Sequence, residues 1–252
     1  MPALIVVALL APPAPAIDTA ARRSIPDAGP SRISLRQVAG PYSFGNGLDL
    51  NYEIHISPDG QFTYQQASYE GVAAEAAGYA RMTGRKLVLT PTSATPEAWP
   101  AGMGLELLPV QWGSRLYLVP EKDMMAFVNA VNRGSEPVTQ ISRGHFFLRE
   151  GDLDKPASGH PDLPGSFASL LLSKPLRGKV LGEETSGFWK VDLGKRNGLH
   201  PGMELCAWSP DRRQCVTLVI SRVEDCCCFA ENRRGSGAPL LNWKVCSRQQ
   251  YD

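Results

Sequence analysis

One stretch of the sequence, residues 191–205, constrains the fold more than any other. It reads Val-Asp-Leu-Gly-Lys-Arg-Asn-Gly-Leu-His-Pro-Gly-Met-Glu-Leu, and apolar and polar residues alternate at both of its ends. That alternation is the period of a β-strand. Asn197-Gly198 is a strong signal for a positive φ angle, and Pro201-Gly202 is the pair expected at the centre of a type II turn. The stretch therefore predicts a strand, a tight double turn and a second strand.

A single apolar residue, Leu199, stands between the two turns, and Gly194 stands where the chain begins to reverse. Turn geometry does not require an apolar side chain at this point. We therefore expect Leu199 to enter a core and to close the end of a small sheet. An ordinary connection between two strands is the alternative interpretation of the pattern.

The same residues carry a resemblance to a known kind of module. The pattern Asp-x-Gly-x-x-x-Gly-φ-x-x-Gly-Met is formed by Asp192, Gly194, Gly198, Leu199, Gly202 and Met203. In this pattern the last third of the chain resembles small β-barrel modules of bacterial envelope proteins, such as the C-terminal domain of the flagellar-assembly protein T and the barrels of rod-shape-determining protein C. Asn242-Trp243 stand where the last strand of such barrels has Gly-Asp. The resemblance implies a small barrel with an assembly or interaction role and no catalytic residue. The remainder resembles only uncharacterised bacterial exported proteins.

Length and charge exclude some classes of protein. The chain has 252 residues, which is enough for one large domain or two small ones. Its net charge of +1 gives no electrostatic support for nucleic-acid binding. The 24 glycines and 21 prolines favour β structure with many turns.

The N-terminus has the pattern of a secretory signal peptide. An apolar run over residues 4–10 is followed by Ala14-Pro15-Ala16, an A-x-A type of cleavage site. The run is too short to span a bilayer, and no later run is long enough, so no transmembrane segment is expected in the mature chain. We expect residues 1–16 to be the signal, cleaved after Ala16, and residues 17–32 to be a tether. The protein is then exported, to the periplasm or the extracellular space. A merely apolar N-terminus is the alternative, since no basic residue precedes the run.

Residues 33–150 are predicted to form an antiparallel β domain with one helix, lipocalin-like in outline. Alternation over residues 51–57 leads into Ser57-Pro58-Asp59-Gly60, a strong hairpin turn. Apolar residues with helical spacing follow Pro120, and Gly134 supplies the stop. A loop is predicted from Pro91 to Met103. Whether the sheet closes into a barrel is left open.

The rest of the chain divides at a change of composition. Residues 151–176 are predicted to be a linker, because their first half is dense in Asp, Pro and Gly. Residues 177–252 are predicted to form a small barrel, because short strand patterns recur there at close spacing. We expect strands at residues 179–181, 188–193, 203–208, 215–223, 226–230 and 243–247.

All six cysteines lie in this last part, at Cys206, Cys215, Cys226, Cys227, Cys228 and Cys246. In an exported protein such cysteines form disulfides, whereas in a cytosol they are thiols or metal ligands. We predict a Cys206–Cys215 disulfide, with the two residues opposite each other on neighbouring strands. A pairing of Cys246 with one of the three consecutive cysteines is a second hypothesis. A reactive or metal-binding thiol cluster is a further alternative, although no C-x-x-C spacing supports it.

No motif of an enzyme is present in the sequence: no G-x-S-x-G, P-loop, G-x-G-x-x-G or H-E-x-x-H occurs. We therefore expect no catalytic residue, no metal and no cofactor. The leading hypothesis is a non-enzymatic interaction or assembly module that binds another envelope protein. The alternative is binding of a small hydrophobic ligand inside the N-terminal domain. An interior cavity would favour the ligand, and a filled core would favour the interaction module.

Overall fold

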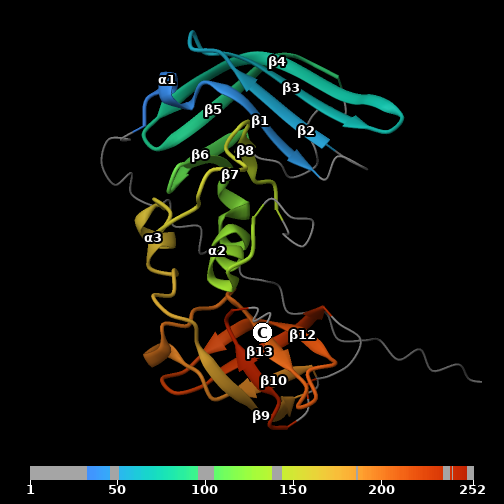
Figure 1. Ribbon diagram of the computed structural model, residues 1–252, viewed down its shortest axis with the longest axis vertical. Helices are drawn as coiled ribbons and strands as arrows, with labels where there is room; N and C mark the ends of the chain where they lie inside the picture. The colour runs from blue at the N-terminus through green and yellow to red at the C-terminus, as the bar shows by residue number, and fades with distance from the viewer. Residues whose placement is uncertain are drawn as a thin grey trace, which may run out of the picture.

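The computed structural model describes residues 33–45, 51–95, 105–137, 144–185, 187–234, 239 and 241–248. In these residues the chain forms two closed antiparallel barrels, one of eight strands and one of six (Figure 1). The predicted mainly-β class with a small C-terminal barrel is therefore confirmed, and the N-terminal sheet also closes. The predicted signal, with Ala14 and Ala16, and the tether lie outside the described residues. No helix in the described part is long and apolar enough to cross a membrane.

The first barrel follows the order of its strands in the sequence. Each strand pairs with the next, and β8 returns to pair with β1. A short helix, α1 (Leu35–Val38), precedes the barrel. The strands are β1 (Gly40–Gly45), β2 (Asn51–Ile56), β3 (Gln61–Ser68), β4 (Gly71–Thr83), β5 (Lys86–Ala94), β6 (Glu106–Trp112), β7 (Arg115–Pro120) and β8 (Phe147–Arg149).

Side chains fill the interior of this barrel. Along each strand every second residue points inward, and the inward set is dominated by large apolar and aromatic residues. Those that are almost wholly buried include Tyr42, Ile54, Ile56, Phe62, Tyr64, Leu87, Leu89, Leu107, Leu118 and Phe147. The interior is thus a packed core.

Strand β5 runs into the segment predicted to be a loop. The loop predicted to start at Pro91 is wrong there, because β5 continues through Pro91 to Ala94. The register shifts at this point, which lets the ladder pass a residue without an N–H group. Gly78 lies opposite, and a Cβ atom on it would lie 2.1 Å from the carbonyl oxygen of Thr90. The absence of a side chain at Gly78 therefore permits the close approach of the two strands.

The predicted helix is present as η2 (Glu121–Asp123) followed by α2 (Met124–Arg133), and it ends at Gly134 with a φ of 68°. Its apolar side, with Phe127 at the centre, packs on the outer face of the barrel at β6 to β8. Strand β7 is therefore buried on both faces.

The segment predicted to be a linker is fastened to the first barrel over residues 151–164. The buried Asp152 accepts a hydrogen bond from the backbone N–H of Leu116 at 2.9 Å. Arg115 Nε donates to the carbonyl oxygen of Lys155 at 2.6 Å. Composition indicates exposed turns here, whereas these tertiary hydrogen bonds hold the segment against the β6–β7 hairpin. The division into domains at residues 33–150 and 177–252 stays a prediction.

Asp152→Ala is expected to loosen this segment. The substitution leaves a buried backbone N–H without its acceptor, which costs about 1–3 kcal/mol. We expect proteinase K, which has broad specificity, to cleave within residues 151–164 severalfold faster than in the parent, measured by limited proteolysis. The matched control is Asp154→Ala, because Asp154 is exposed. Equal cleavage rates in the two variants would contradict the role of the Asp152 carboxylate.

The second barrel has a different strand order, β10-β13-β12-β11-β14-β9, and closes where β9 pairs with β10. Its strands are β9 (Arg177–Thr185), β10 (Phe188–Val191), β11 (Glu204–Trp208), β12 (Cys215–Val223), β13 (Cys228–Arg234) and β14 (Lys244–Cys246). The helical turn η3 (Lys195–Asn197) lies between β10 and β11, and α3 (Gly165–Ala168) lies between the barrels in the sequence.

The double turn occupies the end of the second barrel, as the pattern predicts. Leu199 is 1% exposed and packs in the barrel core. Gly198 has a φ of 81°, and Gly202 of the Pro201-Gly202 turn has a φ of 87°. Glycine is needed at Gly194 for a different reason, because a Cβ atom there would lie 2.5 Å from the carbonyl oxygen of Glu224. Gly194 thus permits the β12–β13 turn to pack against the double turn.

Helix α2 joins the two barrels, and Figure 1 shows it between them. The buried Asn129 donates through Nδ2 to the carbonyl oxygen of Gly202 and accepts through Oδ1 from the N–H of Glu204, both at 3.0 Å. Arg133 Nη1 lies 2.8 Å from Glu204 Oε2. One face of α2 therefore packs on the first barrel, and the opposite face holds the double turn of the second.

Candidate functional site

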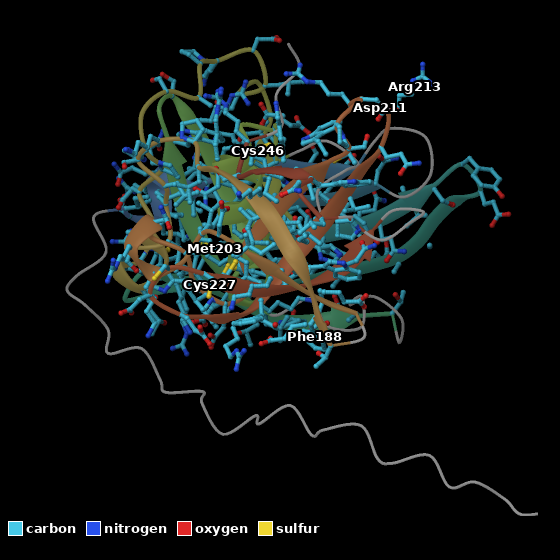
Figure 2. All side chains as sticks on the ribbon, turned by 90° about the horizontal axis from the view of Figure 1, so that it is seen from below. Phe188, Met203, Asp211, Arg213, Cys227 and Cys246 are labelled. Atoms are coloured by element: carbon cyan, nitrogen blue, oxygen red, sulfur yellow. The ribbon has the colours of Figure 1, made fainter. Side chains whose placement is uncertain are left out.

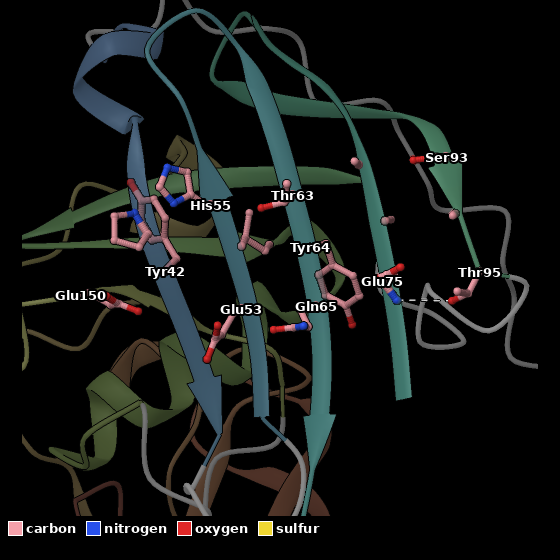
Figure 3. Close-up of a pocket in the computed structure, with 15 residues that line it drawn as sticks. Tyr42, Glu53, His55, Thr63, Tyr64, Gln65, Glu75, Ser93, Thr95 and Glu150 are labelled. Atoms are coloured by element: carbon pink, nitrogen blue, oxygen red, sulfur yellow. Dashed lines mark hydrogen bonds between the residues drawn. The ribbon is translucent and has the colours of Figure 1, made fainter. Parts of the chain in front are cut away.

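A hollow of about 880 Å³ lies on the first barrel. Figure 3 shows its polar side chains along β2, β3 and β4. The strand register brings them together, because Glu53 pairs with Gln65, which pairs with Glu75. His55 and Thr63 form the next row. We call this surface, lined by residues of β1 to β5 and by Thr95 and Glu150, the acidic hollow.

Strand alternation places the polar lining of the acidic hollow on the outer face of the barrel. In β2 the buried Ile54 and Ile56 point inward, so Glu53 and His55 point outward. The small residue Ala77 contributes to the same surface beyond Thr63. The hollow is therefore open to solvent, and it is separate from the filled interior.

Three carboxylates give the acidic hollow its charge: Glu53, Glu75 and Glu150. No lysine or arginine is among its lining residues. Within the described ranges none of the three carboxylates takes part in an ion pair. The backbone N–H of Glu75 donates to Thr95 Oγ1 at 3.3 Å, which fixes one end of the hollow (Figure 3). Such a surface suits a ligand that carries positive charge and hydrogen-bond donors.

No group of three or more His, Cys, Asp or Glu side chains in the described part of the chain is arranged to hold a metal ion. The polar side chains that line the acidic hollow offer hydrogen bonds and negative charge. The sequence alone does not group the residues of the acidic hollow. Alternation alone places Glu53 and His55 on one face of a strand, but their proximity to Glu75 depends on pairings with β3, which local pattern does not specify.

The structure divides the six cysteines, all of which are free thiols, into two sets. Cys206, Cys215 and Cys246 come together on β11, β12 and β14. Cys226 and Cys227 lie in the β12–β13 turn and Cys228 begins β13, and Figure 2 shows Cys227 away from Cys246.

The predicted placement of Cys206 opposite Cys215 is wrong. Cys206 pairs with Thr217, and Cys215 pairs with Trp208. The reason lies in the turn, where the N–H of Ser209 donates to the carbonyl oxygen of Gln214 at 3.0 Å and so fixes the register of the hairpin. Cys215 is consequently a diagonal neighbour of Cys206.

The cysteine directly opposite Cys206 is Cys246, on the other side of β11. The second hypothesis, which paired Cys246 with one of the three consecutive cysteines, is therefore not supported. Among those, Cys228 is wholly buried in the core of the barrel, and burial raises its pKa to about 12. The Cys227 thiol donates to Glu224 Oε2 at 3.3 Å.

Comparison of this chain with models of protein families, with curated proteins and with solved structures found no match. The resemblance of the last third to small envelope barrels accordingly remains an expectation.

Proposed function

We propose that this chain is an exported, non-enzymatic interaction or assembly module of a bacterial envelope. Its first barrel binds a positively charged, extended segment of another envelope protein in the acidic hollow. The observation that carries the proposal is the combination of a hollow of about 880 Å³ with three carboxylates that pair with no cation among the described residues. Lysine or arginine side chains of a partner would supply the missing cations and complementary charge.

The filled interior supports this function over binding of a small hydrophobic ligand within the barrel. A ligand cavity needs inward positions with small side chains or empty space. Here the inward positions of β1 to β3 carry Tyr42, Ile54, Phe62 and Tyr64, which are almost wholly buried against one another. Admitting a ligand among them would require the core to repack.

The apolar run at residues 4–10 and the Ala14-Pro15-Ala16 site support export, because together they have the pattern of a secretory signal peptide. An exported chain would meet an oxidising compartment, in which cysteines form disulfides. We therefore propose disulfide bonding as part of the mature state.

A charge-neutralised variant tests the acidic hollow. Glu53→Gln, Glu75→Gln and Glu150→Gln are combined in one chain, which keeps shape while removing three negative charges. We expect the parent to bind a fluorescent decapeptide of alternating Lys and Ser. The variant should bind the same peptide about tenfold or more weakly, because complementary charge is removed. Fluorescence anisotropy at low ionic strength measures the affinity of each chain for the peptide. Added salt should weaken binding to the parent.

The matched control neutralises three exposed carboxylates outside the hollow, with Glu70→Gln, Asp154→Asn and Asp225→Asn. It should bind the peptide as the parent does. Affinity capture from envelope extract should retain the same protein on the parent and on the control, and lose it on the hollow variant. Equal binding by all three chains, or preference for an acidic decapeptide, would overturn the proposal.

A further inference from the structure

Three thiols share the outer face of the second barrel. Cys206 on β11 lies directly opposite Cys246 on β14, and Cys215 on β12 lies diagonally across from Cys206. In each strand the neighbouring residues point into the core, as Ala207 and Val216 do. The three sulfur atoms therefore project to the same side of the sheet.

A buried cation lies beside this group. The guanidinium of Arg133, from α2 of the first barrel, acts electrostatically on both Cys206 and Cys215. Its Nη1 pairs with Glu204, while its Nε is buried and has no hydrogen-bond partner among the described residues. Arg133 thus places positive charge next to the thiols, where it stabilises a thiolate.

The three thiols differ in reactivity. The Cys206 thiol donates a hydrogen bond to Cys215, which raises the pKa of Cys206 and lowers the pKa of Cys215. Burial raises the pKa of Cys246. Cys215 and Cys246 are both partly exposed, whereas Cys206 is 3% exposed. Because the thiolate is the nucleophile, Cys215 is the thiol that a small electrophile meets first.

The structure assigns to Cys206, Cys215 and Cys246 a thiol–disulfide exchange site for small-molecule disulfides. The Cys215 thiolate attacks one sulfur of the disulfide RS–SR, a Cys215–S–S–R bond forms, and RS⁻ leaves and takes up the proton that Cys215 lost. The Cys206 thiolate then attacks Cys215 Sγ, and the second RS⁻ leaves and takes up the proton of Cys206. Two protein thiols are oxidised to one disulfide, and RS–SR is reduced to two RSH.

Cys246 completes the series of exchange steps. Diagonal residues on neighbouring strands have Cα atoms roughly 7–8 Å apart, whereas directly opposite residues lie about 4.5–5.5 Å apart. A disulfide fits Cα separations of about 4.4–6.8 Å. The Cys206–Cys215 disulfide therefore forms only with a shift of the strands and is strained, so the Cys246 thiolate displaces Cys215 from Cys206. A Cys206–Cys246 disulfide across β11 and β14 remains, and the released Cys215 takes up the proton that Cys246 lost. This inference does not depend on the acidic hollow or on its partner.

Trapping variants test each step. All are made in a Cys226→Ser, Cys227→Ser background, because these two residues lie in the β12–β13 turn outside the group. The protein is reduced, incubated with glutathione disulfide, alkylated and mapped by mass spectrometry. We expect the background protein to lose two free thiols and to yield a Cys206–Cys246 disulfide. Adding Cys206→Ser should trap a glutathione adduct on Cys215.

The remaining variants locate the final steps. Adding Cys246→Ser should stop the exchange steps at a Cys206–Cys215 disulfide. Adding Cys215→Ser should slow the loss of free thiols about tenfold or more, because the accessible thiolate is gone. Circular dichroism establishes that each variant is folded. An adduct on Cys228 or Cys246 in the Cys206→Ser protein would overturn the assignment. So would equal rates of thiol loss with and without Cys215.

Discussion

Replacing Leu199 with aspartate is expected to destabilise the second barrel more than any other single change considered. Leu199 is 1% exposed and lies in a core that includes Leu205 and Leu218. The substitution removes apolar contacts and places a carboxylate among them, at a cost of about 4 kcal/mol or more. For a barrel of this size the melting temperature should fall by about 15 °C or more, measured by differential scanning calorimetry.

The matched control is Leu241→Asp, which makes the same chemical change at a side chain that is 62% exposed. It should melt within a few degrees of the parent, because surface substitutions cost about 0.5 kcal/mol or less. If Leu199→Asp melts like the control, then Leu199 is not a core residue in solution and the double turn is a solvated loop.

Arg133→Met is expected to have the second largest effect, at the junction of the barrels. The Arg133 and Glu204 side chains are 9% and 15% exposed, and their charged atoms lie 2.8 Å apart. Methionine keeps much of the length of the side chain and removes the charge, so Glu204 is left buried without its partner. Breaking such a pair costs about 3–5 kcal/mol. Urea denaturation with two-state analysis gives the change in the free energy of unfolding.

Further variants separate the loss of the ion pair from other effects. Arg213, near Asp211 in Figure 2, has a side chain that is 86% exposed, and its Nε lies 3.8 Å from Asp211 Oδ2. Arg213→Met should therefore change stability by less than about 1 kcal/mol. Arg133→Met combined with Glu204→Met should recover part of the loss, because the unpaired charge is removed. The single variant Glu204→Met completes the cycle: a double variant that is destabilised by the sum of the effects of Arg133→Met and Glu204→Met would show that the two side chains are not coupled.

Local chemistry predicts much of the fold. The alternation over residues 51–57, the turn at Ser57-Pro58-Asp59-Gly60 and the helical spacing before Gly134 each specify one element, and β2, β3 and α2 follow them. These features depend on residues a few positions apart, where backbone preferences and the period of apolar residues decide the outcome. The positive φ angles of the double turn and the burial of Leu199 belong to the same class.

The sequence by itself thus determined the β class, the helix and the double turn, since these rest on preferences of neighbouring residues. Tertiary structure alone decided the pairing register, and with it both candidate sites. Glu53 meets Gln65 and Glu75 only through β3, and Cys206 faces Cys246 only because β14 returns beside β11. The sequence pattern does not reveal that Arg133 of one barrel lies beside the thiols of the other. Strand partners are chosen by packing over the whole chain, and that choice leaves no periodic signal within any one strand.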